Sequence, residues 1–225
     1  MKNARNGRFA GVKAFFSVIW RNPMSRMGFL ILLAFLLMAV FGPVVIPDLK
    51  SDYAHRLQPP SAQHWLGTDL AGKDTLLQLI LGSRDVLLVA AYAGLFAVLI
   101  AAAIGIVAGL QGGIVDRVLM LFTDVVLTMP SFPVTMILSM VIRITDPLVF
   151  GLVLGLWSWA GLAKAIRSQV LTLKHREFIE ASRIMGISKI NIILYDVLPN
   201  LVSYIAVNFI SIMKGAITSS VGLMI

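Results

Sequence analysis

The 225-residue sequence contains no cysteine, which excludes disulfide bonds, thiol nucleophiles and thiolate metal sites. It is also poor in charge, because only 13% of its residues are Asp, Glu, Lys or Arg, whereas 58% are hydrophobic. The mean hydropathy is +0.89. This balance is far from that of a soluble domain and predicts a membrane protein.

Acidic residues are scarcer than basic ones, with 11 Asp and Glu against 19 Lys and Arg, for a formal net charge of +8. Such an excess is common in nucleic-acid-binding proteins, but its distribution argues against that class. The basic residues fall into two main groups, one before the first apolar run and one around a central polar loop: Lys2, Arg5, Arg8, Lys13, Arg21 and Arg26, then Lys164, Arg167, Lys174, Arg176, Arg183 and Lys189. A positive-inside bias places basic residues in this way, so we expect contact with membrane lipid and no nucleic acid.

Long apolar runs predict an all-α fold, a polytopic transmembrane helical bundle with five spans. The expected spans are residues 27–47, 86–110, 118–142, 148–163 and 199–225. Pro130 and Pro133 are expected to kink the third span. Two small-xxx-small pairs, Gly105 with Gly109 and Gly151 with Gly155, predict close helix packing. Trp157 and Trp159 are expected near the inner end of the fourth span, in an aromatic belt.

The charges between the spans predict the topology. Residues 1–26 are basic and amphipathic and are expected on the cytoplasmic side, followed by an uncleaved first span and a transmembrane domain over 27–225. The connection 48–85 carries four basic and five acidic residues, so we expect it outside, whereas the basic loop 164–198 is expected in the cytoplasm. Five crossings then place the C-terminus outside.

The expected outer loop contains two patterns that could suggest chemistry. Residues 67–73 satisfy the phosphate-loop spacing GxxxxGK, but Asp74 stands where Ser or Thr must follow, and its carboxylate would repel phosphates. We predict instead a turn in which Thr68 or Asp69 caps a helix through Leu81. His55, His64 and the nearby acids match no metal-ligand spacing. We therefore predict no catalytic residue, no metal site and no cofactor bound by this chain.

The polar stretch 174–200 reads as two short helices separated by Gly186. Phe178, Ala181 and Met185 share one helical face. Gly186 suits a left-handed helix end, and Ser188 can cap the next helix. Pro199 suits the first turn of the following span. The stretch is either a solvated helix along the membrane surface or a docking element whose apolar residues enter a groove on a soluble partner.

Several ordered motifs resemble those of one transporter family. Glu180-Ala181-Ser182, followed by Gly186 and Leu198-Pro199, resembles the Glu-Ala-Ala…Gly…Leu-Pro cytoplasmic loop of ABC importer permeases. Ser182 stands for the second Ala of that pattern, and Asp196 stands for the usual apolar residue before Leu198. The stretches 64–74 and 112–130 resemble the binding-protein-dependent dipeptide, oligopeptide and nickel branch, in particular its C-type permease subunit.

This resemblance implies a permease subunit that is not itself an enzyme and imports di- or oligopeptides, or alternatively oligosaccharides or nickel, across a prokaryotic inner membrane. It implies three kinds of partner: two ATP-binding subunits that use ATP and Mg, a second and different permease subunit, and an extracytoplasmic substrate-binding protein. The loop 176–199 would dock on an ATP-binding subunit. Its expected docking residues are Glu177, Glu180, Ala181, Ser182, Met185, Gly186, Leu198 and Pro199. The family also leads us to expect a sixth span beyond the five.

Three polar residues fall within the expected spans. Asp124, Asn208 and Lys214 could line a translocation path. For Lys214, a structural ion pair or a side chain reaching the interface is an equal alternative. For Asp124, near the inner surface, we favour the structural role. Two other classes remain open: an ion-coupled secondary transporter, which would need intramembrane acids, and a structural scaffold, which would need no docking loop.

Overall fold

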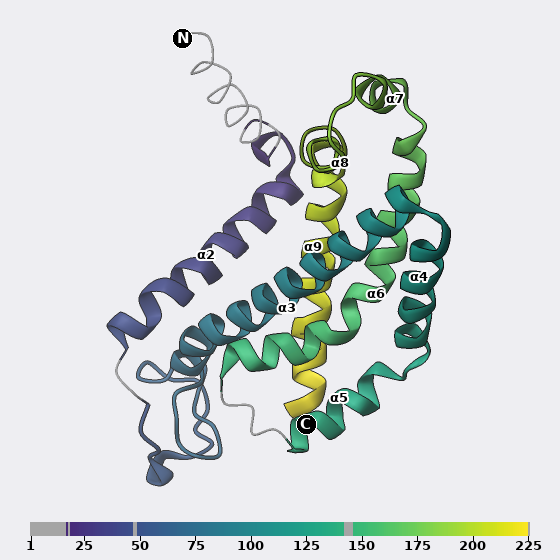
Figure 1. Cartoon of the computed structure of the whole chain (residues 1–225). Helices are drawn as coiled ribbons and strands as arrows, with labels where there is room; N and C mark the ends of the chain where they lie inside the picture. Colours follow the sequence, from purple (N-terminus) through teal and green to yellow (C-terminus); the bar gives the residue numbers. More distant parts are fainter. Residues whose placement is uncertain (1–16, 18, 47–48, 142–145, 225) are drawn as a thin grey trace. The chain divides into compact units, whose positions relative to one another are not determined.

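The computed structural model describes residues 17, 19–46, 49–141 and 146–224, and within these ranges every regular element is a helix. Figure 1 shows them in chain order. The elements are α2 (Pro23–Val45), η1 (Tyr53–His55), α3 (Thr75–Gln111), α4 (Gly113–Thr128), α5 (Ser131–Val141), α6 (Pro147–Lys174), α7 (Glu177–Ile184), α8 (Lys189–Asn191), η2 (Ile192–Val197) and α9 (Leu198–Met224). The predicted all-α class is confirmed.

Four helical segments are long and apolar enough to cross a membrane: α2, α3, α6 and residues 189–222. Helices α4 and α5 meet the same test together and are bent by 74°, so they bring the number to five if the pair is one span. The break lies at Met129 and Pro130, where a proline prevents the helix from continuing. The predicted kink in the third span is confirmed, and residues 142–145 at its expected end lie outside the described residues.

Helix α3 runs without interruption for 37 residues from Thr75, so the predicted helix through Leu81 and the span expected from residue 86 are one helix. The predicted cap at Thr68 or Asp69 is wrong, because the carboxylate of Asp74 accepts the backbone N–H of Leu77 at 3.0 Å. The side chains of Asp69 and Thr68 form other hydrogen bonds. Asp69 accepts the N–H groups of its own turn, and Thr68 donates from its hydroxyl to the carbonyl of residue 55 at 2.6 Å.

Helix α6 ends later than expected, at Lys174 rather than at residue 163. Its last turns continue to bury one side, with Ile166 and Val170 fully buried. The prediction of an aromatic belt near the helix end is therefore wrong for Trp159, which lies in mid-helix. Its side chain is 5% exposed and stacks on Phe122 of α4 with ring centroids 5.8 Å apart.

The chain forms two compact units, residues 1–85 and residues 86–225. In the first unit, the connection between α2 and α3 is held by side-chain hydrogen bonds. His64 Nδ1 lies 2.9 Å from an Asp74 carboxylate oxygen, and this hydrogen bond lowers the pKa of Asp74 from its ordinary value. Asp52 pairs in the same way with His55 at 2.8 Å, which lowers the pKa of Asp52.

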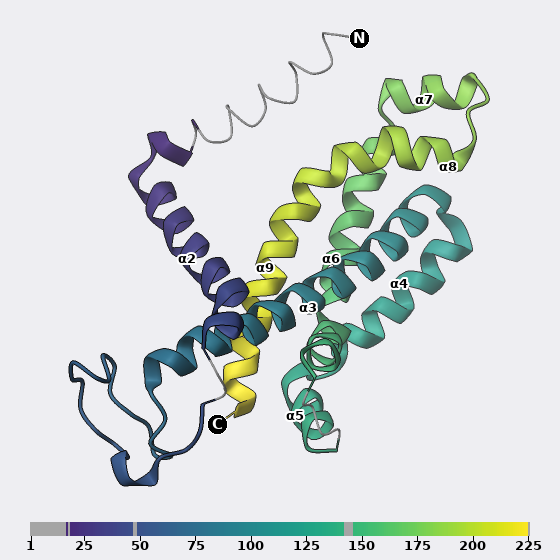
Figure 2. The same ribbon diagram turned by 90° about the vertical axis from the view of Figure 1, so that its left-hand side faces the viewer.

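The second unit is organised by close packing of α3 and α6. A Cβ on Gly105 would lie 2.6 Å from the carbonyl oxygen of Ala163, and one on Gly151 would lie 2.8 Å from that of Val89. Both predicted small-residue pairs thus sit where backbones meet. Early α6 contacts early α3 and late α6 contacts late α3, so the two helices run in parallel (Figure 2). Consecutive crossings alternate in direction, so this agrees with a return crossing by α4 and α5 between them.

Helix α4 is tied to α6 by two charged pairs. Asp116 accepts two hydrogen bonds from the guanidinium of Arg167, at 2.5 and 2.6 Å. Asp124 forms an ion pair with Lys164. A bidentate arginine–carboxylate contact fixes orientation as well as distance, so Asp116 and Arg167 set how α4 lies against α6.

Candidate functional site

The loop after α6 folds into a short helix whose ends are both specified locally. Glu177 and Glu180 lie in the first turn of α7 and Arg183 in its last, the arrangement that favours the helix dipole. Gly186 has a φ of 73°, a left-handed conformation that glycine adopts without steric cost. The backbone N–H of Ile187 then reaches the carbonyl of Ser182 at 3.1 Å, which closes the helix end.

The chain resumes its helical course at once after Gly186. The side chain of Ser188 caps α8 by accepting the N–H of Asn191 at 3.4 Å. The predicted left-handed glycine and serine cap are both confirmed. In Figure 2, α7 and α8 lie one above the other and lead into α9.

Helix α7 buries one side against the rest of the unit. Ile179 is fully buried and Ser182 is 6% exposed. The hydroxyl of Ser182 donates to a carboxylate oxygen of Asp196 in η2 at 2.9 Å. The two positions that depart from the importer loop pattern are therefore hydrogen-bonded to each other.

The opposite side of α7 presents apolar side chains without a described neighbour covering them. Ile184 is 87% exposed and Met185 69% exposed, and Phe178 and Ala181 are exposed as well. We call these four residues the docking face. Exposed apolar clusters are typical of surfaces that contact either a protein or a membrane.

The predicted docking residues separate into two groups. Glu177, Glu180, Ala181, Met185 and Gly186 are exposed on or beside α7. Ser182 is buried, Leu198 is half-buried against the core, and Pro199 is exposed at the start of α9. The loop motif thus combines residues that face outward with residues that hold the loop in place.

Pro199 lies in the first turn of α9, as predicted, although helical backbone already precedes α9 from Lys189. The residues before it form a π-helix, η2, in which the N–H of Leu198 reaches the carbonyl of Ile193. Pro199 has no N–H to offer to the preceding turn. The side chain of Asn200 donates instead to the carbonyl of Asp196 at 2.7 Å.

Two exposed apolar residues were missed from the sequence. Leu194 is 49% exposed and Tyr195 75% exposed, both on η2. In the sequence they stand out only as part of an apolar stretch between two polar ones. A π-helix changes which residues share a helical face. A 3.6-residue period therefore could not assign them.

The three polar residues of the spans are not brought together. Asp124 pairs with Lys164, so an ion pair accounts for its charge. The amide of Asn208 donates to the carbonyl of Tyr204 at 2.8 Å. Lys214 is exposed and forms no ion pair with any residue that the structure describes. A path lined by these residues stays a prediction.

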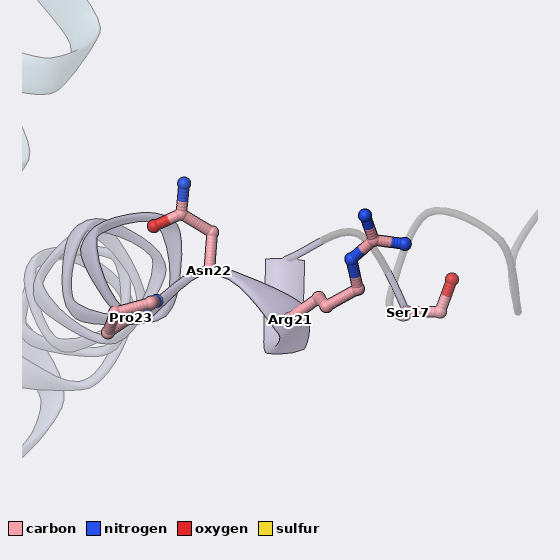
Figure 3. Close-up of a pocket in the computed structure, with 4 residues that line it drawn as sticks. All are labelled: Ser17, Arg21, Asn22 and Pro23. Atoms are coloured by element: carbon pink, nitrogen blue, oxygen red, sulfur yellow. The ribbon is translucent and has the colours of Figure 1, made fainter.

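A hollow of about 760 Å³ lies at the start of α2 in the first unit (Figure 3). It is lined by Ser17, Arg21, Asn22 and Pro23. The side chain of Asn22 accepts the N–H of Met24 at 3.0 Å, and Pro23 occupies the first helical position. These two residues start a helix in the usual way.

The structure offers little for metal or cofactor binding. Across the described ranges, no three His, Asp or Glu side chains gather as a metal site would require. His55 and His64 each pair with a different aspartate.

Comparison with known proteins gives the family. Residues 101–225 match the family described as binding-protein-dependent transport system inner membrane component, and residues 13–60 match the N-terminal TM domain of oligopeptide transport permease C. The dipeptide transport system permease protein of Bacillus subtilis (strain 168) is 33% identical over 199 residues, which cover 88% of this chain. The oligopeptide transport system permease protein of Mycobacterium tuberculosis (strain ATCC 25618 / H37Rv) is 32% identical over 198 residues, 85% of this chain and 68% of that protein.

The chain spans 62% of the length of the Bacillus relative. Its apolar helices and its relatives make it a multi-pass membrane protein. The match to the importer family model covers more than half of the chain, including α4 to α9 and the docking face. The chain belongs to the family of binding-protein-dependent transport system inner membrane components.

Proposed function

We propose that this chain is the transmembrane permease subunit of an ATP-driven, binding-protein-dependent importer of di- or oligopeptides. The substrate class rests on the relatives, which are named as dipeptide and oligopeptide transport permeases. In this role the chain is not itself an enzyme and helps to form the translocation path, while ATP and Mg are used by partner subunits. The proposed setting is a prokaryotic inner membrane with the N-terminus in the cytoplasm.

The observation that carries this function is the docking face on α7. Four apolar side chains are exposed on this helix. Its other side is fixed by the buried side chain of Ile179 and by the hydrogen bond from Ser182 to Asp196. A rigid short helix with exposed apolar residues fits a hydrophobic groove on a partner. The proposed partner is one of two ATP-binding subunits, and a second, different permease and an extracytoplasmic substrate-binding protein complete the proposed assembly.

The experiment is native mass spectrometry of the gently extracted complex with Met185→Asp. A charge in a desolvated contact costs several kcal/mol, so we expect at least about a tenfold loss of the ATP-binding subunit, equivalent to about 1.4 kcal/mol. Leu70→Asp is the matched control, because Leu70 is 74% exposed in the loop before α3. Unchanged subunit content with Met185→Asp, or a wild-type chain extracted only with itself, would overturn the proposal.

A further inference from the structure

A groove of about 730 Å³ lies within the second unit between the end of α3 and the segment from α7 to η2. Its volume falls within the range of about 300–1,000 Å³ typical of small-molecule sites. The groove is separate from the docking face, because none of the four docking-face residues lines it: Phe178, Ala181, Ile184 and Met185. Figure 2 shows the end of α3 beside α8.

The floor of the groove is apolar. Val107 and Leu110 come from the last turns of α3, and Ile190, Ile192 and Ile193 come from α8 and η2. Ile190 is 68% exposed. Because α3 is apolar enough to cross a membrane, we expect its last turn near the boundary between the hydrocarbon and the headgroup layer.

The polar part of the groove carries charge of one sign. Lys174, Arg183 and Lys189 line it, and no described lining residue is acidic. Within the described residues, none of these three cations forms an ion pair. Three cations beside an apolar floor complement an amphiphile with an anionic head, and Asp116, which interacts electrostatically with Lys174, does not line the groove.

We propose that this groove binds an anionic phospholipid, with the phosphate headgroup among Lys174, Arg183 and Lys189 and the first acyl carbons against Val107 and Leu110. Basic pockets between membrane helices bind such headgroups. The lysine and arginine stems can cover apolar surface while their charged ends reach the headgroup. A bound lipid would join the end of α3 to the segment that leads from the docking face into α9.

The test uses the full chain, with the subunits that co-purify with it, in nanodiscs of equal parts phosphatidylglycerol and phosphatidylcholine. Lipid retained after extraction into detergent is quantified by mass spectrometry. Each surface cation contributes about 1 kcal/mol to anionic lipid binding, or about a fivefold change in the binding constant. The variant Lys174→Gln/Arg183→Gln/Lys189→Gln is expected to lose the preference for phosphatidylglycerol, and raised salt is expected to weaken the preference of the wild type.

The matched control is Arg56→Gln/Arg84→Gln/Arg117→Gln, which removes three exposed cations that do not line the groove. It is expected to keep the lipid preference. Lys174→Arg/Lys189→Arg keeps the charges and is also expected to keep it, which separates lost charge from lost folding. Equal phosphatidylglycerol retention by the groove variant would overturn the proposal. So would loss of an ATP-binding subunit with lipid retention unchanged, because the cations would then serve a protein. The readout is bound lipid, so it does not depend on the proposed transport function.

Discussion

Two segments between the long apolar helices of this chain use their polar groups in different ways. Between residues 49 and 74, carboxylates and hydroxyls are bonded to nearby backbone and to histidines, as with Asp69, whose carboxylate meets two backbone N–H groups and the Gln78 amide. In α7 to η2, the side-chain bonds are fewer and apolar residues such as Ile184 are exposed. The first segment forms hydrogen bonds among its own groups, whereas the second exposes the apolar docking face for which we propose a partner. The two segments therefore differ in how many of their side chains are hydrogen-bonded and in how much apolar surface they expose.

Among the variants that test this comparison, the largest expected effect comes from Gly186→Val, which acts on the turn that presents the docking face. A side chain in the left-handed region costs about 1–2 kcal/mol and more for a β-branched residue. No atom lies within 4 Å of a Cβ placed there, so backbone strain alone is responsible. We expect about a tenfold loss of ATP-binding subunit, corresponding to about 1.4 kcal/mol, measured by co-purification.

Gly186→Asn is the control, because asparagine tolerates the left-handed conformation. It should retain most of the partner. If valine and asparagine had the same effect, the turn would not set the docking face, and the contrast between the two segments would lose its main support.

A smaller effect is expected from Ser182 and Asp196, the hydrogen-bonded pair that attaches the buried side of α7 to η2. Ser182→Ala removes the donor to Asp196 and should destabilise the α7–η2 contact by about 1 kcal/mol. Asp196→Leu should also destabilise it, whereas the double variant Ser182→Ala/Asp196→Leu restores an apolar contact and should recover stability. Hydrogen exchange over residues 177–197 measures all three. Additive effects would show that the two residues act independently, because coupled neighbours depart from additivity by about 0.5–3 kcal/mol.

How much could be predicted from the sequence depended on the range of the interactions. The turn at Gly186 and the cap at Ser188 are local, so residue type and spacing were enough. The start of α3 was not predictable, because Thr68, Asp69 and Asp74 are all good caps and the choice depends on distant partners such as His64. The same holds for Ser182 with Asp196 and for Asp124 with Lys164, which meet only after helices pack.

The smallest expected effect is a pH dependence in the segment between residues 49 and 74. The bond to His64 holds the pKa of Asp74 below its ordinary value, so the stabilisation is fully present above the unfolded value of about 3.9 and is lost as pH falls through the folded one. Hydrogen-exchange protection of residues 49–74 should therefore decrease below about pH 4. Asp74→Asn, which does not titrate, should show a weaker pH dependence over this range. An unchanged profile in that variant would assign the response to Asp52 or Asp69, whose pKa values are also lowered.

The unbroken helical course from Lys189 to Met224 has a mechanical consequence. A helix is stiff along its axis, but the course changes direction between α8 and α9 (Figures 1 and 2). Of its elements, only η2 departs from α-helical bonding. Within the described residues 189–224, there is no irregular loop between α8 and α9 that would absorb a displacement of the Gly186 turn. Such a displacement would pass through η2, the π-helical turn before Pro199, which is the element between the two directions.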